Sequence, residues 1–147
     1  MTEVLEDPRT APAGPHPALR SLEPLVGAWT ISGPGGLGGR VMYEWMEGGG
    51  FLVQHVDLVQ DGQHTRGVEY IGHDQNSGVL RSHYFSPSGE ILEYVYELTD
   101  DTLTIWFGEA GSPARFTGTF TDDGNANSGA WTWPGGGYTS TMTRDSS

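Results

Sequence analysis

The first candidates for chemistry are a histidine and an aspartate placed two residues apart. His55 and Asp57 lie in a largely apolar run, and side chains at this spacing share one face of a strand. A carboxylate beside an imidazole raises the pKa of the ring and can orient it as a general base. Phe51 and Val53 share the face, which favours an interior position. An ion pair on a solvated outer face is the alternative.

His83, in a second apolar run, extends this set. If His83 and His55 both point inward, they could anchor the polar head of a ligand or a metal ion. A protein metal site typically needs about three converging ligands, and the sequence offers no strong third ligand for this pair. We therefore predict no metal site. The alternative for each histidine is a hydrogen-bonded structural role.

Large aromatic side chains recur along the chain. They could line a pocket for a flat apolar ligand, with tyrosine hydroxyls fixing its orientation. Filling a core is the commoner role of such residues. The aromatic set is Tyr43, Trp45, Tyr94, Tyr96, Trp106, Trp131 and Trp133. The ligand contacts that we predict are Tyr43, Trp45, Phe51, Val53, His55, His83, Tyr94, Tyr96 and Trp131.

Composition excludes several classes of function. The 147 residues include 19 Asp and Glu against 7 Lys and Arg, which gives a formal charge of −12, and there is no lysine or cysteine. An acidic surface repels phosphate backbones and anionic lipids, so we expect neither nucleic acid nor a membrane as a partner. Lysine Schiff bases, disulfides and thiolate metal sites are excluded by the missing residue types.

The amino-terminal stretch differs from the rest. Residues 1–15 are acidic and rich in proline, which predicts a disordered tail ahead of one barrel domain at 16–147. The stretch lacks the apolar core of a signal peptide, and no later run is long enough to cross a bilayer. We therefore expect a cytoplasmic protein.

These candidate residues lie on a series of short strand-like runs, which an amphipathic segment at 15–26 precedes. The runs are near 26–32, 39–47, 50–60, 64–72, 78–86, 90–99, 102–108, 114–121, 127–133 and 137–144. Glycine- and aspartate-rich turns separate them, and short turns join antiparallel neighbours. Because about ten strands exceed what an open sheet usually holds, we predict an all-β, up-and-down antiparallel barrel with a short N-terminal helix.

Several motifs make the chain resemble a known group of barrels. Gly27-Ala28-Trp29, entered from a short helix, resembles the Gly-x-Trp signature of the calycins, which include lipocalins and fatty-acid-binding proteins. In such barrels a basic residue of the last strand packs over the tryptophan, a position that Arg144 matches. The resemblance implies a structural clasp of Gly27, Trp29 and Arg144, which leaves the other end of the barrel for function.

Further motifs are similar to a bacterial family of domains of unknown function with nitrobindin-type barrels. They are Leu25–Trp29, Tyr43–Gly49, Ile71–Asp74, Phe116–Phe120 and Asp122–Asn125. Nitrobindins hold a b-type haem through a histidine close to the C-terminus, whereas the last histidine here is His83. We therefore predict no cofactor. Haem held by His83 or His55 as a substitute ligand is a third interpretation.

Two functional hypotheses follow. The first is a carrier or sensor, monomeric or homodimeric, that binds a small apolar or aromatic ligand inside the barrel. The second is a cofactor-free enzyme, such as a cyclase, isomerase or hydratase, in which His55, Asp57 or His83 moves protons. The strand register decides between inward and outward positions for all of these residues, because a slip of one residue reverses every face.

Overall fold

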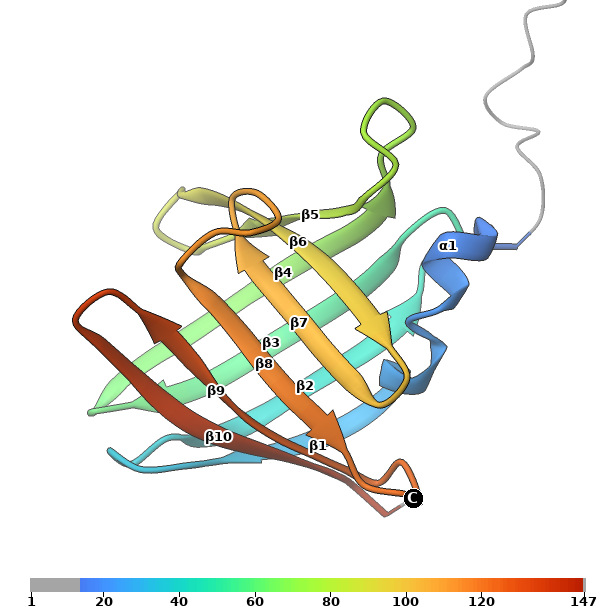
Figure 1. The fold of residues 1–147 in the computed structure, drawn as a ribbon. Helices are drawn as coiled ribbons and strands as arrows, with labels where there is room; N and C mark the ends of the chain where they lie inside the picture. Colours follow the sequence, from blue (N-terminus) through green and yellow to red (C-terminus); the bar gives the residue numbers. More distant parts are fainter. Residues whose placement is uncertain (1–13, 147) are drawn as a thin grey trace, which may run out of the picture.

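The computed structural model describes residues 14–146, in which ten antiparallel strands form a closed barrel (Figure 1). The strands are β1 Gly27–Ser32, β2 Gly38–Trp45, β3 Leu52–Gln60, β4 Gln63–His73, β5 Leu80–Phe85, β6 Ile91–Thr99, β7 Thr102–Phe107, β8 Arg115–Phe120, β9 Ala126–Trp133 and β10 Gly136–Arg144. Each strand pairs with its neighbours in the sequence, and β1 pairs with β10. The predicted up-and-down barrel is confirmed.

The amphipathic segment at 15–26 forms the predicted short N-terminal helix in two separate pieces. They are α1 (Pro17–Arg20) and the 3₁₀ turn η2 (Glu23–Leu25). Pro24 contributes to the break, because it has no amide hydrogen to donate to the carbonyl of Arg20, as a continuous α-helix would require. Neither piece in residues 14–146 has the length of a membrane-spanning helix. The predicted tail, apart from Gly14 and Pro15, lies outside the described residues.

The helical pieces close one end of the barrel. Leu19, Leu22 and Leu25 are buried in the same cluster as Trp29, whose side chain has an exposed fraction of 0%. The indole nitrogen of Trp29 donates a hydrogen bond to the carbonyl of Leu25 at 2.8 Å, so this ring is fully buried without an unmet donor. We call this the closed end. The β1–β2, β3–β4 and β9–β10 turns lie at the opposite, open end (Figure 1).

Arg144 fastens the last strand to the closed end. It is the register partner of Trp29, and its guanidinium carbon lies 4.2 Å from the centre of the indole ring. The guanidinium also donates hydrogen bonds to the carbonyls of Val26 (2.7 Å), Pro24 (2.9 Å) and Gly124 (3.3 Å). This is the contact between first and last strands that the calycin resemblance implies.

Gly27 makes room for this arrangement. Its φ of +129° lies in a region that side chains rarely adopt, and a Cβ there would come within 2.6 Å of Nη1 of Arg144. Any larger residue at position 27 would therefore be strained and would displace the guanidinium.

Arg144→Ala tests this clasp. We expect it to lower the free energy of unfolding by about 2–3 kcal/mol, because it removes a cation–π contact and hydrogen bonds to three carbonyls. Arg144→Lys should recover only part of the loss, since an ammonium lacks the planar fork that reaches several carbonyls. Urea denaturation would measure both. Arg115→Ala, at an exposed arginine of β8, is the control, and equal losses in Arg144→Ala and Arg115→Ala would contradict the account.

Candidate ligand-binding site

A cavity of about 590 Å³ occupies the barrel interior. It reaches the open end, where the β3–β4 turn lines it with Gln60, Asp61 and Gln63. Apolar side chains of several strands form much of its wall, among them Leu58, Ile105, Phe116, Trp131 and Met142. A volume of this size is in the range of protein pockets that hold small molecules.

The alternation of β3 places the predicted histidine–aspartate pair outside this cavity. Gln54, Val56 and Leu58 line the cavity, so His55 and Asp57 point to the outer face. The interior interpretation is therefore wrong. The register explains this outward position. Leu52, the first residue of the strand, is fully buried inside the closed end, so the even-numbered residues of β3 point inward and the odd-numbered ones point outward.

On the outer face, His55 and Asp57 have different partners from those expected. Nε2 of His55 lies 2.7 Å from a carboxylate oxygen of Glu44 on β2. Asp57 is 2.5 Å from Nε2 of His64 on β4, and this hydrogen bond is the main reason that the pKa of Asp57 is lowered. Both are solvent-exposed contacts between a histidine and a carboxylate on the outer face, the position that the sequence left open as the alternative, and such exposed pairs contribute little to stability.

Phe51 and Val53 also belong to the outer surface. The Phe51 ring packs edge-on against Tyr70, with ring centres 6.3 Å apart, and is 44% exposed. Val53 is buried there as the register partner of Tyr70. Phe51 and Val53 thus form an apolar cluster on the outside of the barrel. In the sequence, this cluster has the same pattern as a strand face that points into the interior.

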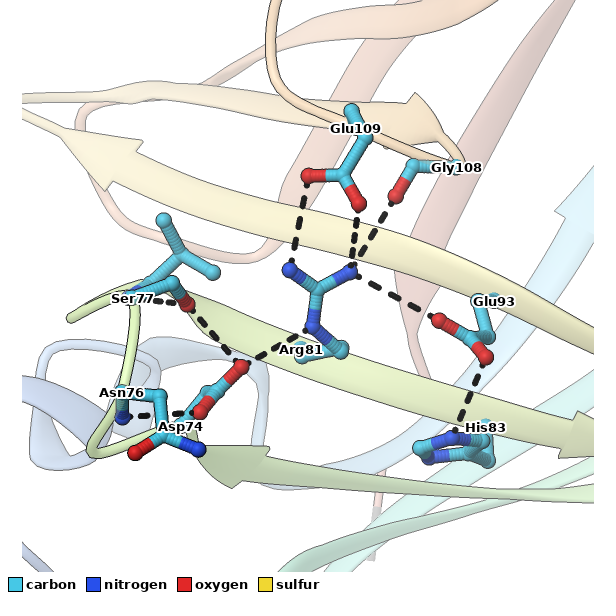
Figure 2. A network of polar contacts seen from close by, with 9 residues as sticks. Asp74, Asn76, Ser77, Arg81, His83, Glu93, Gly108 and Glu109 are labelled. Carbon is cyan, nitrogen blue, oxygen red and sulfur yellow. Dashed lines mark hydrogen bonds and ion pairs between the residues drawn. The ribbon is translucent and has the colours of Figure 1, made fainter.

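His83 lies in a surface network of charged groups (Figure 2). Its Nε2 is 3.6 Å from a carboxylate oxygen of Glu93. Arg81, two residues earlier on the same outer face of β5, contacts Glu93 and also Asp74 and Glu109. This network joins β5, β6 and the adjoining loops, so its geometry accounts for His83 as a surface residue.

These positions separate the predicted histidines from the cavity. None of the five histidines, all within residues 14–146, lines it. A haem inside the barrel with His55 or His83 as axial ligand therefore does not fit. The same described residues hold no group of three or more His, Cys, Asp or Glu side chains arranged for a metal ion.

The predicted aromatic contacts divide into two sets. Tyr43, Tyr94, Tyr96 and Trp131 lie on the cavity wall, and the Tyr94 and Trp131 rings meet edge to face with centres 5.9 Å apart. Trp45 instead packs against the core cluster.

Two other tryptophans of the aromatic set also lie away from this cavity. Trp133 is 43% exposed and borders a smaller hollow beside Tyr138, where the two rings meet with centres 6.0 Å apart. Trp106 is half-buried, and it alternates along β7 with Leu103 and Ile105, which line the cavity.

Glu69 is the main polar residue of the cavity, and the sequence analysis missed it. Its side chain is only 4% exposed. One carboxylate oxygen accepts a hydrogen bond from the hydroxyl of Ser82 at 2.5 Å, and the other accepts one from the hydroxyl of Tyr96 at 2.8 Å. Burial raises the pKa of Glu69, and these two hydrogen bonds oppose the increase. The two hydrogen bonds thus hold the Glu69 carboxyl group in one orientation inside the barrel.

Tyrosine hydroxyls surround this carboxyl group. Burial, reinforced by the charge of Glu69, raises the pKa of Tyr94 to about 12 and also raises the pKa values of Tyr43 and Tyr96 above their usual range. All three hydroxyls therefore stay protonated at neutral pH. Tyr96 already donates its proton to Glu69, so Tyr43 and Tyr94 are the two of the three that could donate to a ligand. Such groups suit a site that orients a ligand by hydrogen bonds.

Two further polar atoms at the cavity are buried without a hydrogen-bond partner in the described part of the chain. They are the hydroxyl of Tyr84 and the side-chain nitrogen of Asn127, a residue that is 2% exposed. The Tyr84 hydroxyl occupies the space that a Cβ of Gly67 would fill. An unmet buried polar group costs about 1–3 kcal/mol, so both atoms are positions where a polar group of a ligand would be stabilised.

A sequence signal for Glu69 does exist. Glu69 shares a strand face with Ile71, which is fully buried, and its register partner on β3 is Gln54. Its neighbours Val68 and Tyr70 lie on the outer face, and their apolar side chains make the opposite orientation the more natural prediction. Only the strand register, which the buried residues Ile71 and Leu52 fix, shows which face of β4 points into the barrel.

Comparisons with known proteins leave the family open. No protein-family model matches the chain, and no curated protein matches it. The likeness to calycins consequently stands at the level of the fold, a closed antiparallel barrel of ten strands.

Glu69→Gln tests the buried carboxyl group through the pH dependence of stability. Because the pKa of Glu69 is raised in the folded state, its proton stabilises the fold fully below the unfolded pKa of about 4.3. That contribution is lost as pH rises through the folded pKa. Relative to Glu69→Gln, the native protein should lose stability across this window by at most about 1.4 kcal/mol per pH unit.

Denaturation curves recorded at several pH values would measure this difference. Glu97→Gln, at an exposed carboxylate on the outer face of strand β6, is the matched control and should follow the native protein. Parallel stability profiles for the native protein and Glu69→Gln would contradict the burial of an ionisable group at position 69.

Proposed function

We propose that this protein binds a small apolar or aromatic molecule inside its barrel, as a carrier or sensor. The observation that carries the proposal is the cavity of about 590 Å³, with an aromatic and aliphatic wall and a few buried polar groups. Ligand pockets typically combine these features, in which apolar surface supplies affinity and polar groups fix orientation.

The two ends of the barrel support this proposal in different ways. Trp29 and the leucines of the helical pieces fill the closed end, so a ligand would enter from the open end. Asp61 and Leu37 line the cavity near that entrance. Deeper inside, Tyr84 and Asn127 offer one hydroxyl and one amide nitrogen to a polar group of the ligand.

An enzyme without a cofactor is the second candidate, and Glu69 is the observation that favours it. A buried carboxyl group with a raised pKa, placed among tyrosines in a cavity, resembles the general acids and bases that enzymes tune by burial. Such an enzyme, a cyclase, isomerase or hydratase, would move protons through Glu69. His55, Asp57 and His83 would lie too far outside the cavity wall for this role.

Titration with N-phenylnaphthylamine, a neutral aromatic probe whose fluorescence rises in apolar surroundings, tests ligand binding. We expect saturable binding to the native protein. Ser140→Phe, which adds a ring inside the cavity, should weaken it about tenfold or more, the equivalent of about 1.4 kcal/mol. Thr139→Phe adds the same ring on the exposed face of the same strand and should leave binding unchanged. Equal affinities for both variants would place the probe elsewhere and contradict the proposal.

The outer histidines give a further test. His55→Ala and His83→Ala should each bind the same probe within about twofold of the native protein, because exposed ion pairs contribute little energy and neither ring lines the cavity. The same fluorescence titration measures this. A large loss of binding in either variant would contradict the account, because it would mean that this histidine belongs to the binding site.

A further inference from the structure

We infer that the cavity selects ligands that carry an ammonium group next to their aromatic part, with Glu69 as the counter-ion. This inference rests on the proposed binding function and names the chemical class of the ligand. It follows from the charges on the cavity wall, the hydrogen bonds of Glu69 and the aromatic rings around it.

The acidic and basic side chains on the wall are of one kind. Glu69 and Asp61 are the carboxyl groups among the described residues that line the cavity, and no arginine or histidine lines it. An anionic ligand would therefore lose its hydration without meeting a cation, which is costly in a buried site. The net charge of −12 adds a field that attracts cations to the protein as a whole.

Glu69 is arranged to receive a cation. Ser82 and Tyr96 each donate one hydrogen bond, to different oxygens of the carboxylate, and so fix its orientation. An ionised carboxylate has about four acceptor positions, so two remain for a ligand. A charge-assisted hydrogen bond from an ammonium would fill one of them, and such bonds are stronger than those between neutral groups.

The surrounding rings suit the same group. Tyr43, Tyr94 and Tyr96 line the cavity beside Glu69, and their pKa values are raised partly by its charge, which places them within reach of the same field. Aromatic faces attract organic cations. The unpartnered hydroxyl of Tyr84, the register partner of Glu69, could accept a second N–H bond from the ammonium.

Asn127 indicates what else the ligand carries. It lies on β9, five strands from β4 in either direction around the barrel, and therefore faces Glu69 from the opposite wall. Its side-chain nitrogen is a donor without a partner within residues 14–146. A hydroxyl or carbonyl oxygen on the ligand would accept from it, so the class is an arylalkyl ammonium compound with an oxygen acceptor at its other end.

Three probes of nearly equal shape test the inference: naphthylmethylammonium, naphthylmethanol and naphthoate. Calorimetry at neutral pH should find the ammonium bound about tenfold or more tightly than the neutral alcohol, and naphthoate bound most weakly. In Glu69→Gln the preference of ammonium over alcohol should disappear. Glu44→Gln removes a carboxylate from the outer face and changes the net charge equally, so it should retain the preference.

The outcomes separate this inference from the proposed function. If the alcohol binds the native protein as tightly as the ammonium does, or if naphthoate binds best, the selectivity for amines is wrong while the binding function stands. If none of the three binds and N-phenylnaphthylamine also fails to bind, the proposed function fails as well. The comparison among probes on the native protein decides the inference even if Glu69→Gln does not fold.

Discussion

Barrel closure between β1 and β10 is the constraint on which the rest of this structure depends. Trp29 pairs with Arg144 across that seam, and the guanidinium joins the indole face to backbone carbonyls of the closed end. Once the seam is closed, the register of ten strands is fixed around the circle, and alternate side chains must point inward. The position of every residue relative to the cavity follows from this.

The closed end and the cavity have complementary roles. Leucines and Trp29 supply the apolar burial that stabilises one end, which leaves the interior beyond it unfilled. Into that interior the fold places a carboxyl group, Glu69, whose burial opposes its ionisation. A protein that needed only stability would gain by replacing such a group with an apolar one, because buried ionisable groups are costly unless they are paired. The proposed ligand binding would give this buried carboxyl group a role that stability does not.

The sequence was sufficient to predict the architecture, and only part of the site. Tyr94 and Tyr96 were predicted as ligand contacts and lie on the cavity wall, because the alternation of β6 has an unambiguous apolar face. His55 was misplaced because the outer face of β3 also carries an apolar residue, Val53, and local pattern cannot separate two apolar faces. Glu69 was missed for the same reason on β4. Both assignments depend on register, which is a property of strand pairs and the closed barrel and not of one strand.

The central claim is that the barrel interior holds a small amine-bearing aromatic molecule beside Glu69. A crystal structure of the protein grown with naphthylmethylammonium tests it most directly. The account predicts density for the naphthyl rings between the aromatic residues of the cavity, with the nitrogen within hydrogen-bond distance of the Glu69 carboxylate. A cavity filled by rearranged side chains, or a ligand bound on the outer face, would contradict the account.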